Sequence, residues 1–263
     1  MRDHSHNCAN ARTVPQGESS IVKIRVVVPL AHARFNQETA EEFGRWTAPG
    51  TEASVVNLDE GPQSIESECE DALVVPDFLR KAKEAEAAGC DAVVCDCFAD
   101  PGVRAARELV EIPVIGPGEA AMLLAAALGH KFSVVTVLCQ VFPLINAVAW
   151  RAGVDRKLAS IRSVDIPVLE LSDKARMISA LHSQMVRAIR EDHAEVLVLG
   201  CTGMMGVAAQ LQKTLKSDGF DVPVVDPVAA SMKLAETTVA LGVRQSRLAY
   251  HKPKAYLAAR TAA

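Results

Sequence analysis

The sequence predicts an α/β protein of two pseudo-symmetric lobes, each a mainly parallel sheet flanked by helices, with a site in the inter-lobe cleft. Two observations favour this fold class. Short apolar, β-branched runs alternate with helical patterns, which is typical of parallel sheets covered on both faces. A segment near the middle of the 263-residue chain also recurs near its end. The repeat is too long for a solenoid unit, so it indicates two copies of one half-domain.

The first half of the chain contains four predicted strands separated by helical patterns. The strands are expected at 21–30, 52–58, 91–98 and 112–116, and the helices at 75–89, 100–110 and 118–129. Gly89 is a typical residue for ending the first of these helices. Asp100 and Pro101 are expected to be the N-cap and first residue of the second.

The second half repeats this pattern. A strand is expected at 131–138, an amphipathic helix at roughly 174–191 and a strand at 194–203. Segment 221–235 aligns with 111–125 at a shift of 110 residues, and seven of the thirteen positions from 113 to 125 are identical. The predicted division is therefore a disordered tail at 1–20, an N-terminal α/β lobe at 21–130, a C-terminal α/β lobe at 131–243, and a C-terminal tail at 244–263, for which a return to the first lobe is one arrangement.

Composition excludes several classes of protein. Lys plus Arg is 28 and Asp plus Glu is 32, and a net charge of −4 argues against a nucleic-acid partner. No apolar run reaches the ~18 residues of a membrane span, and the first twenty residues lack a secretory signal. Seven cysteines without small-scaffold spacing indicate reduced thiols in a cytoplasmic protein. The 4% aromatic content requires a mostly aliphatic core.

Two cysteines occupy matching places in the repeat. The strand DAVVCDC ends at Cys97, and the strand EVLVLGC ends at Cys201. Ligands of open α/β sheets bind beyond the carboxyl ends of the strands, so both thiols are expected to face one cleft. One thiol can then remove a proton from one face of a carbon while the other protonates the opposite face, which inverts a stereocentre without a cofactor.

Both cysteines precede predicted helices. Partial positive charge at helix N-termini is expected to lower the thiol pKa values. The backbone N–H groups there, together with the Thr202 hydroxyl, are expected to hold the oxygen of the enolate that forms when the proton leaves.

At these residues the sequence resembles the aspartate/glutamate/hydantoin racemase superfamily, and its hydantoin/allantoin racemase branch most closely. The matching stretches are GPQSIESE (61–68), CDAVVCDCFADPGVRAARE (90–108), PVIGPGEAAM (113–122), FSVVT (132–136), VLGCTGMMG (198–206) and PVVDPVAASMKLAE (223–236). The resemblance implies two lobes, a cleft between them and racemisation by Cys97 and Cys201 without pyridoxal phosphate. It also implies substrate contacts from Phe98, Thr136, Val137, Thr202 and Gly203, to which the repeat adds Pro29 and Leu30 as counterparts of Thr136 and Val137.

The sequence departs from the family pattern after its first strand. The family's Asn-Pro-Asn-Thr/Ser loop is replaced by VPLAHARFNQET, although Asn36 can fold back, and Val137 stands where a second Thr is common. Both changes make the cleft less polar. We therefore expect a small-molecule substrate that is a 5-substituted hydantoin or related cyclic ureide, bulkier or more apolar than allantoin.

Alternative functions remain open at this stage. They are an acidic amino-acid racemase, a decarboxylase or cis–trans isomerase on the same scaffold, and a non-catalytic ligand-binding protein. No cofactor and no metal site are expected, since Cys95 is interpreted as core packing and the tail residues His4, His6 and Cys8 as adventitious ligands at most. By analogy with lobed enzymes of this kind, a homo-oligomer is expected.

Overall fold

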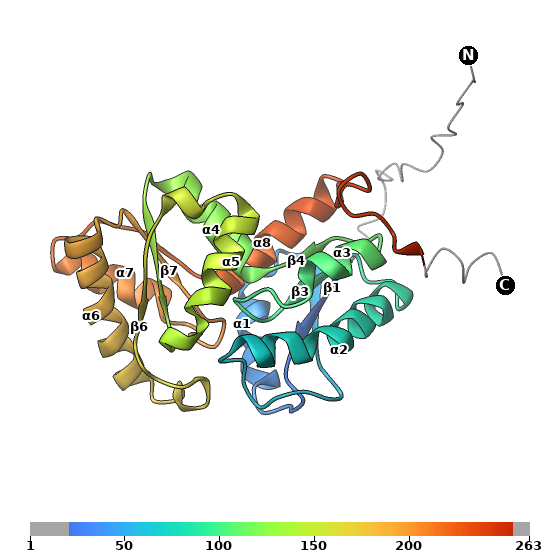
Figure 1. The fold of residues 1–263 in the computed structure, drawn as a ribbon, viewed down its shortest axis with the longest axis horizontal. Coiled ribbons are helices and arrows are strands. Elements are labelled where there is room, and N and C mark those ends of the chain that lie inside the picture. The colour runs from blue at the N-terminus through green and yellow to red at the C-terminus, as the bar shows by residue number, and fades with distance from the viewer. Residues whose placement is uncertain (1–20, 255–263) are drawn as a thin grey trace, which may run out of the picture.

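Two four-stranded parallel sheets form the framework of the molecule (Figure 1). The computed structural model describes residues 21–254. The tail predicted at 1–20, with His4, His6 and Cys8, and the last residues, 255–263, lie outside the described part. Within that part, no helix is both long enough and apolar enough to cross a bilayer.

The first half follows a regular alternation of strand and helix. Its elements are β1 (Val22–Val28), α1 (Asn36–Trp46), β2 (Thr51–Asn57), α2 (Glu68–Ala87), β3 (Ala92–Cys95), α3 (Val103–Leu109), β4 (Val114–Ile115) and α4 (Pro117–Leu128). The strands lie in the order β2-β1-β3-β4, and all pairs are parallel. The four predicted strands are confirmed; β1, β3 and β4 are shorter than predicted, and β2 is shifted by one residue. Helix α2 begins at Glu68, seven residues before the predicted start.

The second half repeats the same order of elements. It contains β5 (Phe132–Thr136), α5 (Phe142–Ala152), β6 (Leu158–Ser163), α6 (Lys174–Asp192), β7 (Val196–Leu199), α7 (Ala208–Ser217), β8 (Val224–Val225) and α8 (Pro227–Ala240). Its sheet order, β6-β5-β7-β8, is that of the first sheet, so the two-lobed parallel fold predicted from the repeat is confirmed. The helix predicted after Cys201 corresponds to α7, whereas the sequence patterns predict no element at α1, α5 and β6.

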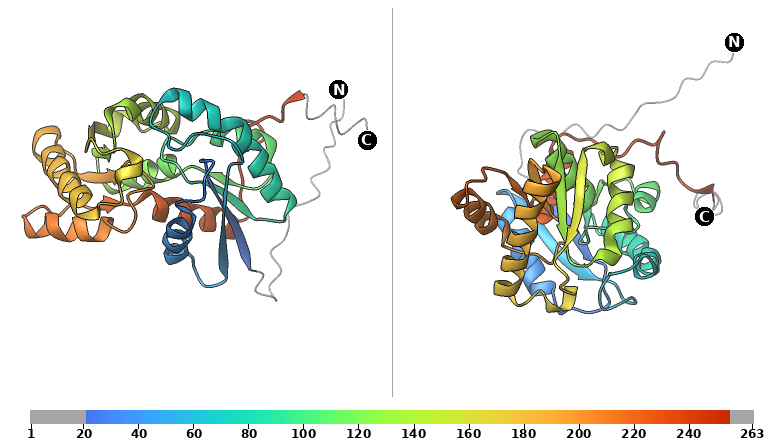
Figure 2. Two further views of the ribbon diagram at one scale, coloured as in Figure 1. Left: turned by 90° about the horizontal axis from the view of Figure 1, so that it is seen from below. Right: turned by 60° about the vertical axis from the view of Figure 1, so that its left-hand side comes forward.

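The last helix of each half packs against the sheet of the other half. Helix α4 contacts β5, β7 and β8, whereas α8 contacts β1, β3 and β4, and the two helices also pack against each other. Figures 1 and 2 show α8 beside the strands of the first half. As a result, one hydrophobic core is continuous across both halves, joining Ile24 and Val94 to Phe132 and Val198. In the folded molecule, α4 therefore belongs with the second sheet and α8 with the first, although each lies in the other half of the sequence.

The exchanged helices α4 and α8 have different N-terminal caps. Asp226 caps its own helix by accepting hydrogen bonds from Val228 N at 2.9 Å and Ala229 N at 3.3 Å. The equivalent residue in α4 is Gly116, where a Cβ would overlap the carboxylate of Asp100. Asp100 supplies the missing cap, accepting from the N–H groups of residues 118 and 119 at 2.9 and 2.8 Å.

The role of Asp100 corrects one prediction. Asp100 was expected to be the N-cap of helix 100–110, but α3 begins at Val103 and its N-cap is Gly102. Asp100 instead adopts a left-handed conformation, with φ of 55°, that turns its carboxyl group toward α4. Burial raises the pKa of this carboxyl to about 7. A cap supplied by a neighbouring loop is not encoded in the helix's own sequence, which is why local patterns assigned it wrongly.

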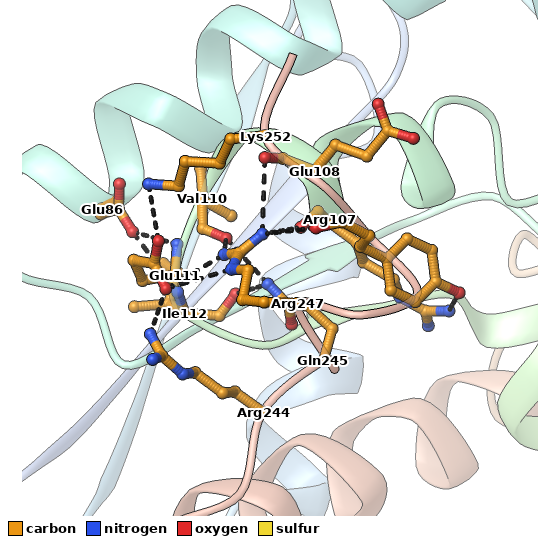
Figure 3. Close-up of polar contacts among 11 residues, drawn as sticks. Glu86, Arg107, Glu108, Val110, Glu111, Ile112, Arg244, Gln245, Arg247 and Lys252 are labelled. Carbon is orange, nitrogen blue, oxygen red and sulfur yellow. Dashed lines mark hydrogen bonds and ion pairs between the residues drawn. The ribbon is translucent and has the colours of Figure 1, made fainter. Parts of the chain in front are cut away.

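The chain after α8 returns to the first half (Figure 3). Arg247 donates to the carbonyl oxygen of Arg107 at 2.8 Å and also to that of Val110. Arg244 and Lys252 form ion pairs with the carboxylate of Glu111. These contacts satisfy carbonyl groups at the C-terminus of α3 that the helix leaves without internal partners.

Candidate active site

The candidate site lies where the strand order of each sheet reverses direction. In the first sheet this is the boundary between β1 and β3, and in the second it is the boundary between β5 and β7. Connections leave a parallel sheet on opposite sides at such a point, which opens a crevice beyond the carboxyl ends of the strands. Pro29 and Cys97 follow the first pair of strands at a short distance, and Val137 and Cys201 follow the second. The fold therefore brings both crevices to one place.

A single cavity of about 400 Å³ occupies this place and is lined by residues of both halves. All nine residues predicted for the site line it. They are Pro29, Leu30, Cys97, Phe98, Thr136, Val137, Cys201, Thr202 and Gly203. Asn36, considered as a replacement for the missing polar loop, is not among the lining residues. The cavity is large enough for a small cyclic molecule with a side chain.

Hydrogen bonds across the cavity tie the two halves together. The Thr202 hydroxyl donates to the carbonyl oxygen of Asp96 at 3.2 Å, which links the two loops that carry the cysteines. On another side, the carboxylate of Glu66 accepts from the backbone N–H of Val168 at 2.7 Å. These two hydrogen bonds join the halves beside the cavity.

Burial favours the protonated form of both thiols. Burial is the largest cause that raises the pKa of Cys97 well above its usual value, and the charge of Asp71 adds to it, whereas a backbone hydrogen bond from Ala99 lowers it. Burial also raises the pKa of Cys201 to about 12, although Gly203 N donates to its sulfur at 3.3 Å. Backbone N–H groups thus favour the thiolates, but burial outweighs them.

This finding corrects the predicted lowering of the thiol pKa values. The helices expected to stabilise the thiolates begin further along the chain, α3 at Val103 and α7 at Ala208. The charge effect of a helix terminus falls off within about one turn. Both cysteines therefore lie on loops before the helices, where single N–H groups contact them and the dipoles contribute little.

The cavity has an apolar wall and a charged wall. The apolar wall comes mainly from the second half and consists of Val141, Leu144, Ile145, Val168, Leu169, Leu171 and Met177, with Phe35 and Ile65 from the first. The charged wall comes mainly from α1 and the loop before it, with Arg34, Glu38, Glu41, Glu42 and Arg45, and Lys174 from the second half. Glu42 is buried and ion-paired with Arg45 at 2.7 Å. A substrate can place an apolar group against one wall while polar atoms face the other.

Asp96 and the charged residues of α1 were not predicted as site residues. A signal for Asp96 was present, because an acid in the apolar strand VVCDCF is unusual and its counterpart in the second half is Gly200. The charges of α1 gave no comparable signal, since charged residues on a helix usually face solvent.

Among residues 21–254, the other cysteines and the histidines do not line the cavity. Cys95 is fully buried in the core, as predicted, and Cys139 is exposed and does not line the cavity. His32 contacts the carbonyl oxygen of Gln63 at 2.9 Å and is also not a lining residue. Across residues 21–254, no group of three or more His, Cys, Asp or Glu side chains is arranged to hold a metal ion.

Comparison with known proteins identifies the family of this chain. A profile described as Asp/Glu/Hydantoin racemase matches residues 24–235, which include both cysteine loops and both sheets. The chain belongs to this family. The family resemblance expected from the cysteine motifs is therefore confirmed, and the chain is an enzyme of the isomerase class built on a racemase scaffold.

Individual relatives refine the comparison. A hydantoin racemase of Rhizobium meliloti is 38% identical over 236 residues, covering 88% of this chain and 96% of the relative. The structure of an allantoin racemase from Pseudomonas fluorescens is 35% identical, with a TM-score of 0.82 over 88% of this chain and 97% of the other. The maleate isomerase Iso from Pseudomonas putida S16, 17% identical with a TM-score of 0.63 over 84% of this chain and 93% of the other, shares the fold alone.

Proposed function

We propose that this racemase-family chain interconverts the enantiomers of 5-substituted hydantoins by a two-cysteine, cofactor-independent mechanism. The observation that carries the proposal is that Cys97 and Cys201, at equivalent strand ends of the two halves, line one cavity. Hydantoin and allantoin racemases among its relatives support the substrate class.

The proposed reaction is a proton exchange at the C5 carbon. The thiolate of one cysteine removes the C5 proton and becomes a thiol, while the electron pair moves to the adjacent carbonyl oxygen as an enolate. The thiol of the opposite cysteine then donates its proton to the other face of C5 and becomes a thiolate. Each turnover therefore exchanges the roles of the two sulfurs, and the other enantiomer enters the reversed state.

The cavity provides groups for the enolate and for the 5-substituent. The Thr202 hydroxyl and the backbone N–H of Gly203 lie beside Cys201 and donate to the Asp96 carbonyl oxygen and to the Cys201 sulfur. Each would exchange that partner for the developing oxyanion. The apolar wall is suited to a bulky hydrocarbon substituent. At pH 8, a thiol with a pKa of about 12 is ionised in about one molecule in 10⁴. We infer that substrate binding shifts the ionisation of the pair.

Proton NMR in D₂O tests this function directly. Single enantiomers of 5-benzylhydantoin, 5-isopropylhydantoin, allantoin, aspartate and glutamate are incubated with the protein, and loss of the C5 or α-proton signal is followed with polarimetry. We expect exchange and loss of rotation with the hydantoins. Cys97→Ser and Cys201→Ser should each abolish racemisation, whereas Cys139→Ser, which alters an exposed thiol outside the cavity, should retain it.

The same experiment separates the alternative reactions. Exchange confined to aspartate or glutamate would favour an amino-acid racemase. Racemisation that survives loss of either thiol would refute the two-cysteine mechanism. A lack of exchange with every compound, in protein whose thiols are shown to be reduced, would refute the proposed function and favour a decarboxylase, a cis–trans isomerase or a binding protein.

A further inference from the structure

One carboxyl group in the cavity has an unused hydrogen-bond acceptor. Oδ2 of Asp96 accepts from the Thr39 hydroxyl at 3.3 Å, but Oδ1 is shielded from solvent and has no partner. Four buried side-chain polar atoms among the described residues lack a partner, and only that of Asp96 belongs to a residue lining the cavity. An unpaired buried acceptor is unfavourable. Because Asp96 lines the cavity, a rotation of its carboxyl group that brings Oδ1 to a donor on a molecule in the cavity would relieve this cost.

The backbone fixes the position of this carboxyl group between the two cysteine loops. Asp96 N donates to the carbonyl oxygen of Val27 in β1 at 2.8 Å. The Asp96 carbonyl oxygen accepts from the Thr202 hydroxyl of the other half at 3.2 Å. Asp96 directly precedes Cys97 in the chain, and the charge of its carboxyl group contributes to the raised pKa of Cys201, so this group lies close to the Cys201 thiol.

The second half cannot carry an equivalent carboxyl group. The strand end Cys95-Asp96-Cys97 corresponds to Leu199-Gly200-Cys201 in the repeat. A Cβ at Gly200 would lie 2.7 Å from Cβ of Thr136, closer than nonbonded atoms approach. The cavity is therefore symmetric in its thiols but has this acceptor on one side only. An acceptor on one side can orient a ring that carries a donor on one edge.

We propose that Asp96 is a substrate-binding residue whose carboxylate accepts a hydrogen bond from a ring N–H, so that the site requires a cyclic ureide with that N–H free. The inference rests on the proposed function and specifies its substrate. Burial raises the pKa of Asp96 to about 6, so at pH 8 the group is ionised and acts as an acceptor only. A hydrogen bond to an ionised acceptor is stronger than one between neutral groups.

Methylated substrates test the contact without depending on a variant alone. Racemisation of 5-benzylhydantoin and of its N1-methyl and N3-methyl derivatives is measured at pH 8 with the native protein, Asp96→Asn and Asp96→Gly. We expect one methyl derivative to have a kcat/KM at least tenfold below the parent in the native protein, mainly through KM. In Asp96→Gly the parent should lose at least tenfold, and the penalty of that methyl group should fall below threefold.

Two controls separate binding from folding. Asp96→Asn keeps an acceptor oxygen at the same place, so it should recover part of the parent's kcat/KM relative to Asp96→Gly. Asp155→Asn alters an exposed acid outside the cavity and should leave the methyl penalty unchanged. Thermal melting of each variant shows whether it is folded.

The results distinguish this inference from the proposed function. If native protein racemises the parent but the methyl penalties are the same in Asp96→Gly, the contact to Asp96 is refuted while the proposed function stands. If native protein tolerates both methyl groups within threefold, the requirement for a free N–H is refuted. If no unmethylated hydantoin exchanges its C5 proton, the proposed function fails and this inference with it.

Discussion

Replacing Gly118 with alanine tests the packing that supports the Cys97 loop. A Cβ at Gly118 would lie far below 3.0 Å from the carbonyl oxygen of Phe98 and 3.2 Å from Cγ1 of Val148. Alanine is preferred over glycine in helices by about 1 kcal/mol. Overpacking against a backbone group that cannot rotate away costs roughly 1–3 kcal/mol. The net effect should be a loss of up to about 2 kcal/mol. The displaced Phe98 carbonyl should also move Cys97 and lower kcat/KM.

A glycine in α1 provides the matched control. Gly44 also lies within a helix, but a Cβ there would meet no atom within 4 Å. Gly44→Ala should therefore raise the free energy of unfolding by up to about 1 kcal/mol. Urea denaturation followed by circular dichroism measures both variants against the native protein. If Gly118→Ala proves as stable and as active as Gly44→Ala, the close approach of the Phe98 carbonyl to α4 does not constrain the loop.

Three further predictions follow from the site and the termini. In Cys97→Ser, alkylation of Cys201 by iodoacetamide should accelerate about tenfold per pH unit from pH 7 to 10, because burial raises the pKa of Cys201 to about 12; a plateau below pH 9 would contradict this. Burial raises the pKa of Asp226 to about 6, so the folded state retains a proton that the unfolded chain has lost, and stability falls as pH rises from about 4 to 7. Asp226→Asn keeps a capping oxygen and should reduce that fall by at most about 3 kcal/mol, measured by denaturation at both pH values. Arg247→Ala should lower the free energy of unfolding by about 1–3 kcal/mol, since it removes the donor to carbonyl groups of α3. Arg187→Ala, which breaks only an exposed pair with Glu191, should cost less than about 0.5 kcal/mol, and equal losses would argue against this role of the C-terminal segment.

The strands that lead to the two candidate catalytic cysteines were predictable because their signals are local. The runs leading to Cys97 and Cys201 are apolar and β-branched, and the repeat placed them in equivalent positions without knowledge of the fold. The nine predicted residues line one cavity because they follow strands that the same repeat places in equivalent positions. It depends on a general property of parallel sheets, namely that their strand ends meet at one edge.

Several helix signals were present in the sequence but not used. Ser67 and Glu70 have the spacing of a capping box. Glu70 N donates to the serine oxygen, and the Glu70 carboxylate accepts from the serine hydroxyl and from the backbone N–H of Glu66. This pair begins α2 seven residues before the predicted start. Similarly, Pro143 in the first turn of α5 and Gly153 in a left-handed conformation at its end mark both limits of that helix.

Other features depend on contacts between distant segments and have no local signal. The exchange of α4 and α8 cannot be deduced from their own sequences, because an amphipathic pattern shows that a helix is buried but not which sheet buries it. The capping of α4 by Asp100 likewise depends on the path of a loop. The raised thiol pKa values depend on how much protein surrounds each sulfur, which only the folded structure reveals.

The exchange of α4 and α8 constrains how such a chain can have arisen. A protein of half this length would expose the face of its sheet that α8 covers here, and it would carry only one of the two cysteines. Two identical half-chains would solve both problems together by trading their last helices, and their single cavity would lie on the two-fold axis. If the two half-chains were then joined into one chain, their sequences would no longer have to be identical. Asp96 opposite Gly200 is a difference that a symmetric dimer could not have held.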